Sequence, residues 1–332
     1  MSGALCSGTG GGTSPEGDDG YLAPGRWQIS FGYRRQKSDR AFIGTDEQEE
    51  RRRLGVISIN RINLFDIGVS YGVTRRFSVS ASVPFMIATR TRPGNVDRLA
   101  GIPNAPDQVN KSVGFGDVSV SGRVWLVRPT AQKSTNISIG FGIKIPTGKK
   151  NVSTVVDTPT GPQRRFNDQS IQLGDGGVGF TIDALAFRSF NRFTLFGSGT
   201  YLFNPRNTNG VPTGRPRPSE AVMSVSDQYL ARAGFSFPIR KIRGLAFNIG
   251  GRIEGVPSSD VFGRSDGFRR PGYAVSIEPG FAYTRKKETW SLNVPVPVVR
   301  NRIRSVPEIR DNALDAAAFA DYLIMAGYSR RF

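Results

Sequence analysis

The stretch RFSVSASVPF, residues 76–85, decides the fold. From Phe77 onward every second residue is apolar, whereas the positions between are Arg76, three serines and a proline. An alternation with a period of two indicates a β-strand whose two faces meet different surroundings. The same alternation recurs in twelve segments, namely 26–34, 63–73, 76–85, 117–126, 136–145, 178–187, 193–203, 228–237, 245–254, 273–283, 289–298 and 321–332. Their length, about 9–12 residues, is what a tilted strand needs to cross a bilayer core.

The joins between these segments alternate strictly between short and long. The short joins are the residues around Thr74, 128–135, 188–192, 238–244 and 284–288, and the long joins are 35–62, 88–116, 147–177, 204–227, 255–272 and 299–320. In an up-and-down barrel, alternate joins lie on the same rim, and outer-membrane barrels have short periplasmic turns and long outer loops. The alternative, a soluble two-sheet sandwich, has strands of about 5–6 residues and would not gather its long joins on one side.

We therefore predict an all-β fold, a transmembrane up-and-down antiparallel β-barrel of 12 strands. Residues 25–332 are expected to form this single outer-membrane domain. Residues 1–24 are glycine-rich and are expected to be a flexible tail, in which Cys6 is an ordinary tail residue. No run of 18 apolar residues occurs, so no transmembrane helix is expected. No signal peptide is visible in residues 1–22, so an exported protein would have lost its signal or begin elsewhere.

Aromatic residues on the apolar faces gather near both rims. Amphipathic rings favour membrane interfaces, so this distribution predicts two membrane girdles. The girdle residues near the short turns are Trp27, Tyr71, Phe77, Trp290, Tyr328 and Phe332, and those near the long loops are Tyr33, Phe65, Phe85 and Tyr201.

The opposite faces carry charge among glycines and serines. Charges inside a barrel need partners or water, and rings of charge tune ion selectivity. Two interpretations remain open, an ion-pair network that braces the wall and a selectivity lining, and both can hold together. The predicted lumen-lining residues are Arg26, Arg34, Asp66, Arg76, Asp117, Arg123, Lys144, Asp183, Arg232, Arg252, Glu254, Glu278 and Asp321.

The net charge of +18 does not point to nucleic acid, because the arginines are scattered and neither a zinc-binding spacing nor a basic helix occurs. No nucleic-acid partner is expected, and a basic surface also suits anionic lipid headgroups.

Two of the long joins contain clusters of arginine, namely GRSDGFRRPG (263–272) and RNRIRSVPEIRD (300–311). These clusters either bind lipopolysaccharide phosphates or form a mouth of the channel that attracts anions. A short helix is expected near residues 311–320, since alanine favours helix.

Catalysis is disfavoured. GVSYG (68–72) matches the G-x-S-x-G pattern, but that motif needs a strand-to-helix elbow and a histidine base, and the chain contains no histidine. Neither a catalytic residue, a cofactor nor a metal site is therefore expected. IPTGKK (145–150) lacks the first glycine and final Ser/Thr of a phosphate loop and is interpreted as the end of a strand.

The terminal segment YLIMAGYSRRF (322–332) resembles the last strand of bacterial outer-membrane proteins, which ends in Phe. That resemblance implies recognition by the barrel-assembly machinery, although Arg330 departs from the apolar pattern.

A second resemblance lies within residues 64–203 and is to a family of outer-membrane transporters linked to phenol meta-pathway degradation. The stretches that carry it are YGVTRRFSVSASVPF, VGFGDVSVSGRVWL, IKIPTGKK and QLGDGGVGFTIDAL. This second resemblance implies passive uptake of small hydrophobic or aromatic compounds.

The sequence thus predicts an integral protein of the bacterial outer membrane, in contact with its lipid and lipopolysaccharide. Its predicted function is a channel or passive transporter for small solutes, either hydrophobic and aromatic or anionic. The alternative is a closed surface barrel that serves adhesion, structure, or protein or lipopolysaccharide binding. A barrel of 12 strands is intermediate in width, so a narrow or loop-plugged channel is expected.

Overall fold

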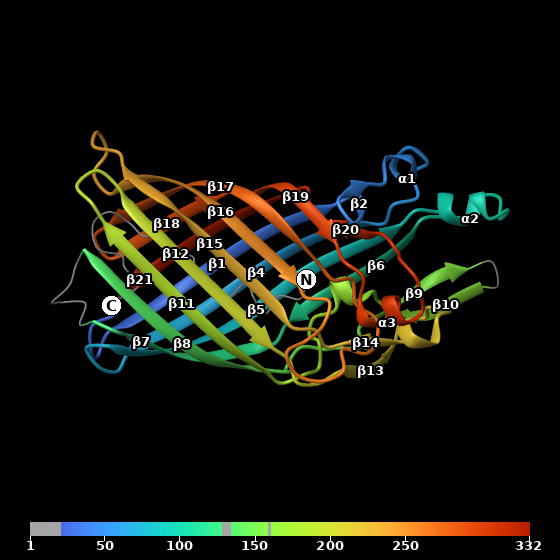
Figure 1. Ribbon diagram of the computed structural model, residues 1–332, viewed down its shortest axis with the longest axis horizontal. Coiled ribbons are helices and arrows are strands. Elements are labelled where there is room, and N and C mark those ends of the chain that lie inside the picture. The colour runs from blue at the N-terminus through green and yellow to red at the C-terminus, as the bar shows by residue number, and fades with distance from the viewer. Residues whose placement is uncertain (1–20, 128–133, 159–160) are drawn as a thin grey trace.

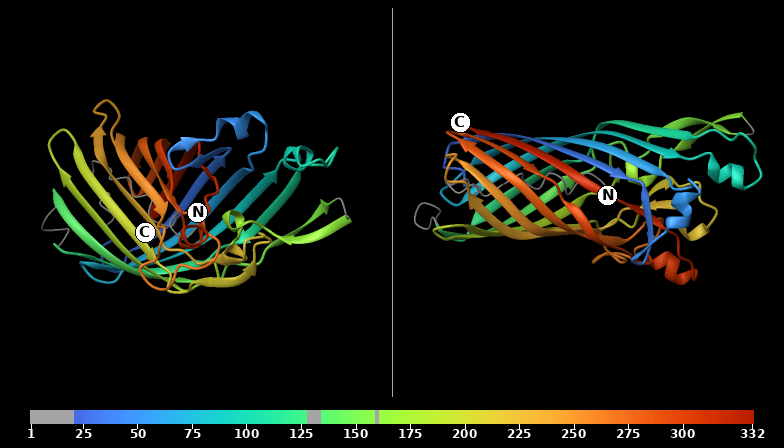
Figure 2. Two further views of the ribbon diagram at one scale, coloured as in Figure 1. Left: turned by 45° about the vertical axis from the view of Figure 1, so that its right-hand side comes forward. Right: turned by 90° about the horizontal axis from the view of Figure 1, so that it is seen from above.

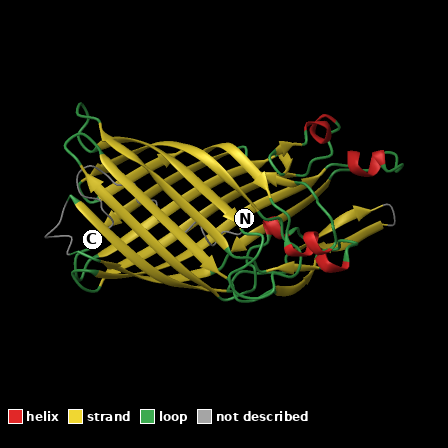
Figure 3. Cartoon of the chain, viewed as in Figure 1, coloured by secondary structure: helices red, strands yellow, loops and turns green. Residues whose placement is uncertain are grey.

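The computed structural model describes residues 21–127, 134–158 and 161–332. Most of the predicted glycine-rich tail, including Cys6, and most of the 128–135 join therefore lie outside the described residues. Within the described residues the chain forms one closed antiparallel β-barrel of 12 strands, as the alternating segments predict. Figures 1 and 3 show the tilted strands of this wall, with the loops gathered at one end and the turns at the other.

Ten wall strands are continuous, and two are each divided into a pair of segments. All neighbours pair antiparallel, and the last strand closes the ring by pairing with the first. In chain order the wall consists of β1 (Trp27–Ser38), β4 (Ile59–Gly72), β5 (Phe77–Arg92), β6 with β7 (Gln108–Phe115 and Val118–Trp125), β8 (Thr135–Ile145), β11 (Gly179–Ser189), β12 (Thr194–Phe203), β15 (Gln228–Pro238), β16 (Leu245–Val256), β17 (Gly272–Arg285), β18 with β19 (Glu288–Asn293 and Val296–Arg302) and β21 (Tyr322–Arg331).

Several wall strands run further toward the loop end than their alternation predicts. β5 continues to Arg92, and β6 begins at Gln108, inside the predicted 88–116 loop. Beyond the apolar span the outward face no longer needs apolar residues, so the alternation ends while backbone pairing continues. Strand 289–298 is divided where Val294 and Pro295 leave the ladder, since proline cannot donate to it.

Small elements gather at the loop end of the barrel (Figure 2). They are β2 (Arg40–Ile43), β3 (Asp46–Glu47), α1 (Glu49–Arg53), α2 (Asn95–Leu99), β9 (Ser153–Thr158), β10 (Gly161–Phe166), η2 (Gln169–Ile171), β13 (Thr208–Pro212), η3 (Pro218–Glu220), β14 (Val222–Ser224), α3 (Val306–Arg310) and β20 (Ala317–Phe319). Among the described residues no helix is long and apolar enough to cross a bilayer.

The loop helix expected at residues 311–320 lies elsewhere. α3 occupies 306–310, and the alanine-rich segment instead forms β20, which pairs with β2. A capping box fixes the start of α3, since the Ser305 side chain accepts from the Glu308 amide while the Glu308 carboxylate accepts from Ser305 N. These two contacts satisfy N–H groups that the first turn of a helix leaves unpaired, and they outweigh the higher helix propensity of alanine.

The two faces of the wall differ as the alternation predicts. Outward apolar side chains such as Phe31, Ile67, Phe141 and Phe281 are 44–62% exposed. The inner face also holds an apolar patch. Ile62, Leu64, Met86 and Ala88 of β4 and β5 are buried against Ile171 of η2, so the 147–177 loop folds into the barrel.

Close approach of β15 and β16 depends on paired glycines. Gly234 lies opposite Gly250, and a Cβ on Gly250 would stand 2.4 Å from the Ala233 carbonyl oxygen.

Backbone atoms cannot yield without separating the two strands, so we expect Gly250→Ala to destabilise the barrel by about 1–3 kcal/mol, as overpacking does. The thermal unfolding midpoint of the detergent-solubilised protein measures this effect. Gly251→Ala is the matched control, because a Cβ there meets nothing within 4 Å, and equal midpoints for the two variants would contradict the prediction.

Candidate functional site

Five predicted lumen residues form one ion-pair network, the mid-barrel network. Arg252 lies 2.7 Å from Glu254 and 3.6 Å from Glu278, and Arg232 lies 3.2 Å from Glu278. Arg34 of β1 contacts Glu254 of β16 at 3.4 Å, although three strand positions of the wall separate β1 from β16. The network therefore reaches across part of the lumen. Three guanidinium groups face two carboxylates, so its net charge is +1.

Arg123 and Asp183 form a second inner ion pair, which crosses an intervening strand. Arg123 of β7 and Asp183 of β11 both lie opposite Gly140 of β8. A Cβ on Gly140 would overlap the Asp183 carboxylate. The glycine thus leaves the space through which the two side chains meet.

Lys144 and Asp117 are buried rather than lining an open passage. The Lys144 ammonium pairs with Asp175 and lies 3.9 Å from the Asp117 carboxylate. Asp117 also accepts the Gly148 amide at 2.9 Å. This triad ties the 147–177 loop to the wall. Asp175 was not singled out from the sequence, because its partner stands 31 residues away and no local pattern links the two.

The other four predicted lumen residues stand apart from these groups. Arg76 lies in a turn and donates to the Leu126 carbonyl at 3.3 Å, and Arg26 is exposed just before β1. Asp66 lies between Gly32 and Pro84 on the inner face, and its Oδ1 is buried without a hydrogen-bond partner among the described residues. Asp321 lies at the loop end, where its amide donates to the Lys37 carbonyl. Their role toward a passing solute stays a prediction.

The predicted girdle residues lie in ring contacts along the outer wall. Trp27 and Tyr71 have ring centroids 4.6 Å apart, and Trp290 and Tyr328 are separated by 5.6 Å. Further toward the loop end Tyr33 and Phe65 are 5.1 Å apart, and other pairs are Phe85–Phe115 and Tyr201–Tyr229. Strands β1, β4 and β5 continue five to seven residues beyond Tyr33, Phe65 and Phe85. Phe77 packs beside Gly122, and the backbone amide of Phe332 donates to the Trp27 carbonyl. That these rings lie at membrane interfaces remains a prediction.

An aromatic cluster narrows the lumen near the turn end. Trp125 is 2% exposed, and its ring lies 6.1 Å from that of Phe187 in an edge-to-face arrangement. Leu185 completes the buried group, and Tyr21 and Phe196 pack against it. All but Tyr21 come from inward positions of the wall. This turn-end aromatic cluster makes the lumen apolar where the mid-barrel network ends.

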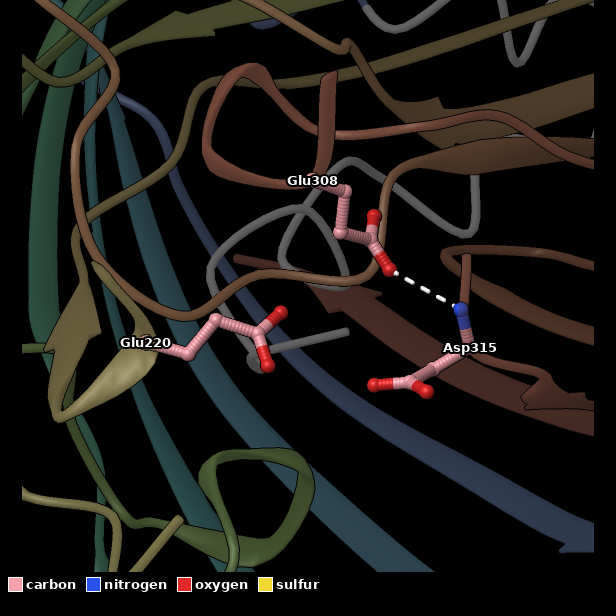
Figure 4. Close-up of side chains that lie close together, drawn as sticks. All are labelled: Glu220, Glu308 and Asp315. Atoms are coloured by element: carbon pink, nitrogen blue, oxygen red, sulfur yellow. Dashed lines mark hydrogen bonds between the residues drawn. The ribbon is translucent and has the colours of Figure 1, made fainter. Parts of the chain in front are cut away.

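At the loop end three carboxylates meet, those of Glu220, Glu308 and Asp315 (Figure 4). Arg270 lies 3.4 Å from Glu308 and 2.7 Å from Asp315, and it also pairs with Glu220. Arg302 binds both oxygens of Glu308 at 2.6 Å. The guanidinium groups supply the positive charge that a cation would otherwise bring. We name these five residues the loop clasp, since they join the 204–227, 255–272 and 303–321 loops.

The arginine clusters noted in the sequence are thus largely turned inward. Arg269 pairs with Asp260, and both side chains are 1% exposed, while Arg270 and Arg302 belong to the loop clasp. Arg264 and Arg310 remain 83% and 59% exposed. The sequence could not reveal the partners of Arg270, because Glu220 and Asp315 lie 50 and 45 residues away on other loops. The carboxylates that pair with Arg269 and Arg302 lie only 9 and 6 residues away, but this spacing alone does not show that the pairs are buried.

Beneath these loops lies the loop-end cavity, about 320 Å³ in volume. Arg90 and Arg215 share one carboxylate there, at 3.7 Å and 3.9 Å from Asp168 Oδ2. Burial alone would raise the pKa of Asp168, but Arg90, Ser170 and Arg215 together lower the pKa to about 2. Asp168 is therefore ionised at neutral pH. The cavity also reaches Glu254 of the mid-barrel network, so it opens toward the lumen.

The two sequence motifs considered for catalysis have structural roles. GVSYG lies within β4, where Ser70 Oγ accepts a hydrogen bond from Ser80 at 2.8 Å. It does not stand at a strand-to-helix elbow. In IPTGKK, the Gly148 amide donates to the Asp117 carboxylate rather than facing an open loop.

No protein-family profile matches the chain, and no curated protein sequence matches it. Among solved structures, the COG4313 outer membrane channel from Pseudomonas putida F1 is similar with a TM-score of 0.59 at 12% identity, over 94% of this chain and 97% of that one. The P. putida toluene transporter TodX gives 0.45 at 12% identity, over 93% and 91%, and the Ralstonia pickettii toluene transporter TbuX gives 0.45 at 10%, over 94% and 90%. The first likeness shows that the fold is that of bacterial outer-membrane β-barrel channels.

Glu308 is the best place to test the loop clasp. Glu308→Ala would leave the Arg302 guanidinium buried without a counter-ion, which costs about 3–5 kcal/mol for a buried pair. We expect the 303–321 loop to open and trypsin to cleave the folded protein after Arg304 or Arg310. Glu50→Ala, which removes an exposed partner of Arg53, is the control and should leave the digestion pattern unchanged. Equal resistance of both variants would show that the pair does not hold the loop.

The same contact predicts a pH dependence. Burial acts to raise the pKa of Glu308, but Arg302 and the Ser305 amide outweigh it and hold the pKa below the usual 4.5. A carboxyl with a lowered pKa stabilises the folded loop above pH 4.5 and loses this effect as the pH falls. Hydrogen exchange of the 303–321 amides should therefore show weaker protection at pH 3 than at pH 6, after correction for intrinsic rates.

Proposed function

We propose that this protein is an integral channel of the bacterial outer membrane through which small solutes pass passively. The observation that carries the proposal is the inner face of the closed wall. It bears the mid-barrel network and the Arg123–Asp183 pair among glycines and serines, whereas the outer face is apolar. A barrel that only displayed loops would need no charged interior, since buried charge is costly without water or partners.

The outer membrane is the proposed location because the outward face of the wall is apolar and bears aromatic rings both at the turn end and further toward the loop end. In that setting lipid would contact the apolar band, and lipopolysaccharide would meet exposed arginines such as Arg264 and Arg310. β21 pairs with both β1 and β18 and thereby closes the ring. Its resemblance to terminal strands of outer-membrane proteins supports recognition by the barrel-assembly machinery.

Two solute classes follow from the sequence, namely hydrophobic or aromatic compounds and anions. The resemblance to phenol-pathway transporters favours the first class. The net charge of +1 on the mid-barrel network favours the second.

The closed surface barrel is the second candidate. The observation that favours it is the inward η2 segment together with the loop clasp, since both narrow the loop end. Conductance separates the two candidates, because only a channel passes ions.

Single-channel recording in a planar bilayer tests the proposal. We expect steady steps and, under a salt gradient, a reversal potential that shows a preference for anions. Arg232→Ala should lower that preference, since a unit charge about 5 Å from an ion in water contributes about 0.8 kcal/mol, or about fourfold in occupancy. Arg123→Ala should act in the same direction.

Arg240→Ala is the control, because Arg240 is exposed in the turn after β15 and should change selectivity little. The absence of conductance at every voltage would contradict the channel proposal and favour the second candidate, the closed surface barrel. An unchanged reversal potential in Arg232→Ala and Arg123→Ala would remove these residues from the selectivity lining.

A further inference from the structure

The residues that line the loop-end cavity are of two kinds. The apolar ones, here called the apolar wall, include Val56, Ile57, Met223, Phe268 and the stretch from Ala316 to Ala320. The others are polar or charged and come from several loops and strands. Its volume, about 320 Å³, lies at the lower end of the range for pockets that hold small organic ligands.

The charged residues that line the loop-end cavity carry an excess of positive charge. Four of the charged lining residues have counter-ions outside this set, since Asp175 pairs with Lys144, Glu254 with Arg34 and Arg252, Arg269 with Asp260, and Arg270 with Glu220 and Asp315. Three cations, Arg51, Arg90 and Arg215, then remain against the single carboxylate of Asp168. Arg51 forms no ion pair with any described residue, and both contacts to Asp168 are longer than 3.5 Å.

The guanidinium group of Arg215 packs on the Phe268 ring, which holds it in place and leaves its N–H donors available for a ligand. Its guanidinium carbon lies 3.8 Å from the centroid of the Phe268 ring, and that of Arg270 lies 4.5 Å from the same centroid. A ring contact of this kind holds a cation without using its N–H groups. The side chain of Arg215 is 31% exposed, so a ligand can reach it. A planar carboxylate matches the fork of a guanidinium in bidentate geometry.

We propose that the loop-end cavity is the solute-binding site of the channel and that it selects small organic monoanions with an apolar body, of which an aromatic carboxylate is representative. Arg215 and Arg90 bind the carboxylate, and the apolar wall formed by Phe268 and residues 316–320 takes the body. The proposal rests on the channel function above and names the class of solute that the channel admits.

The alternatives fit the cavity less well. A cation would meet three arginines against one carboxylate. An inorganic anion would leave the apolar wall in contact with water. A neutral hydrocarbon would displace water from Arg90 and Arg215 without replacing its hydrogen bonds, which is costly for a charged group. The cavity lies next to Glu254 of the mid-barrel network, so a bound anion would stand at the entrance of the lumen.

Isothermal titration of the full-length detergent-solubilised protein with benzoate tests the proposal at low ionic strength. Benzamide, which has the same shape without the charge, and acetate, which has the charge without the ring, are the comparison ligands. We expect each to bind at least about tenfold more weakly than benzoate, the effect of one charge-assisted contact or of a buried ring. Benzamide binding as tightly as benzoate would overturn the choice of an anion, and equal binding of acetate would overturn the apolar subsite.

Variants locate the site. Arg215→Gln should weaken benzoate binding by about tenfold or more, and Arg90→Gln, which serves if the first variant fails to fold, should act in the same direction. Arg164→Gln removes the same charge from the exposed β10 strand outside the cavity and should leave the affinity unchanged. An equal loss in Arg164→Gln would show attraction by overall charge and overturn the site.

Conductance of the same preparation separates this inference from the proposed function. Channels that conduct but do not bind benzoate would overturn the inference and leave the function standing. Benzoate binding that depends on Arg215 in a protein without conductance would overturn the channel and leave an anion-binding surface barrel.

Discussion

Closure of the sheet is the constraint on which the rest of the structure depends. Because β21 pairs with both β1 and β18, the ring is closed, and apart from the loop-end segments β6 and β19 each wall strand is paired on both sides. Closure also divides the residues of each strand strictly between an outer and an inner face. The side chains of the outer face all meet one uniform environment and can be apolar. The side chains of the inner face meet those of other strands across a confined space, so the charged ones must find partners there.

Small residues determine which inner charges can meet. Arg123 and Asp183 stand on strands that are not neighbours, and they pair only because Gly140 between them has no side chain. Gly250, beside Arg252 of the mid-barrel network, lets β15 and β16 approach closely where Gly234 faces it. The high glycine content therefore serves the packing of the lumen as well as the turns. A sequence pattern of charge, glycine and charge on successive strands at one level indicates such cross-strand pairs.

The wall was predictable from the sequence because its information is local. Within each strand, the alternation of apolar and polar residues shows which side chains point outward and which point inward. The alternation of short and long joins gives the order of the strands around the ring. Two features that were not predicted nevertheless had a local signal in the sequence. Ser305 and Glu308 do match the S-x-x-E capping pattern, so the position of α3 could have been found. Leu64 and Met86, apolar on an inner face, were a second local signal that a loop enters the barrel. By contrast, nothing near Arg270 in the sequence indicates Glu220 or Asp315 as its partners.

Along the barrel axis the interior changes character in a definite order. The loop-end cavity joins cations to an apolar wall, the mid-barrel network follows with Arg34, Arg232 and Arg252 against two carboxylates, and the turn-end aromatic cluster around Trp125 comes last. Conduction requires sites that attract a solute but release it again, and several weak sites in series meet this requirement better than one tight site. The arginines of the network are already paired, so an anion that reaches them can exchange partners without leaving a bare charge behind. In the proposed channel, the apolar body of such a solute would next meet the aromatic cluster, so a solute with both a charge and a ring matches these three regions better than a solute with only one of them.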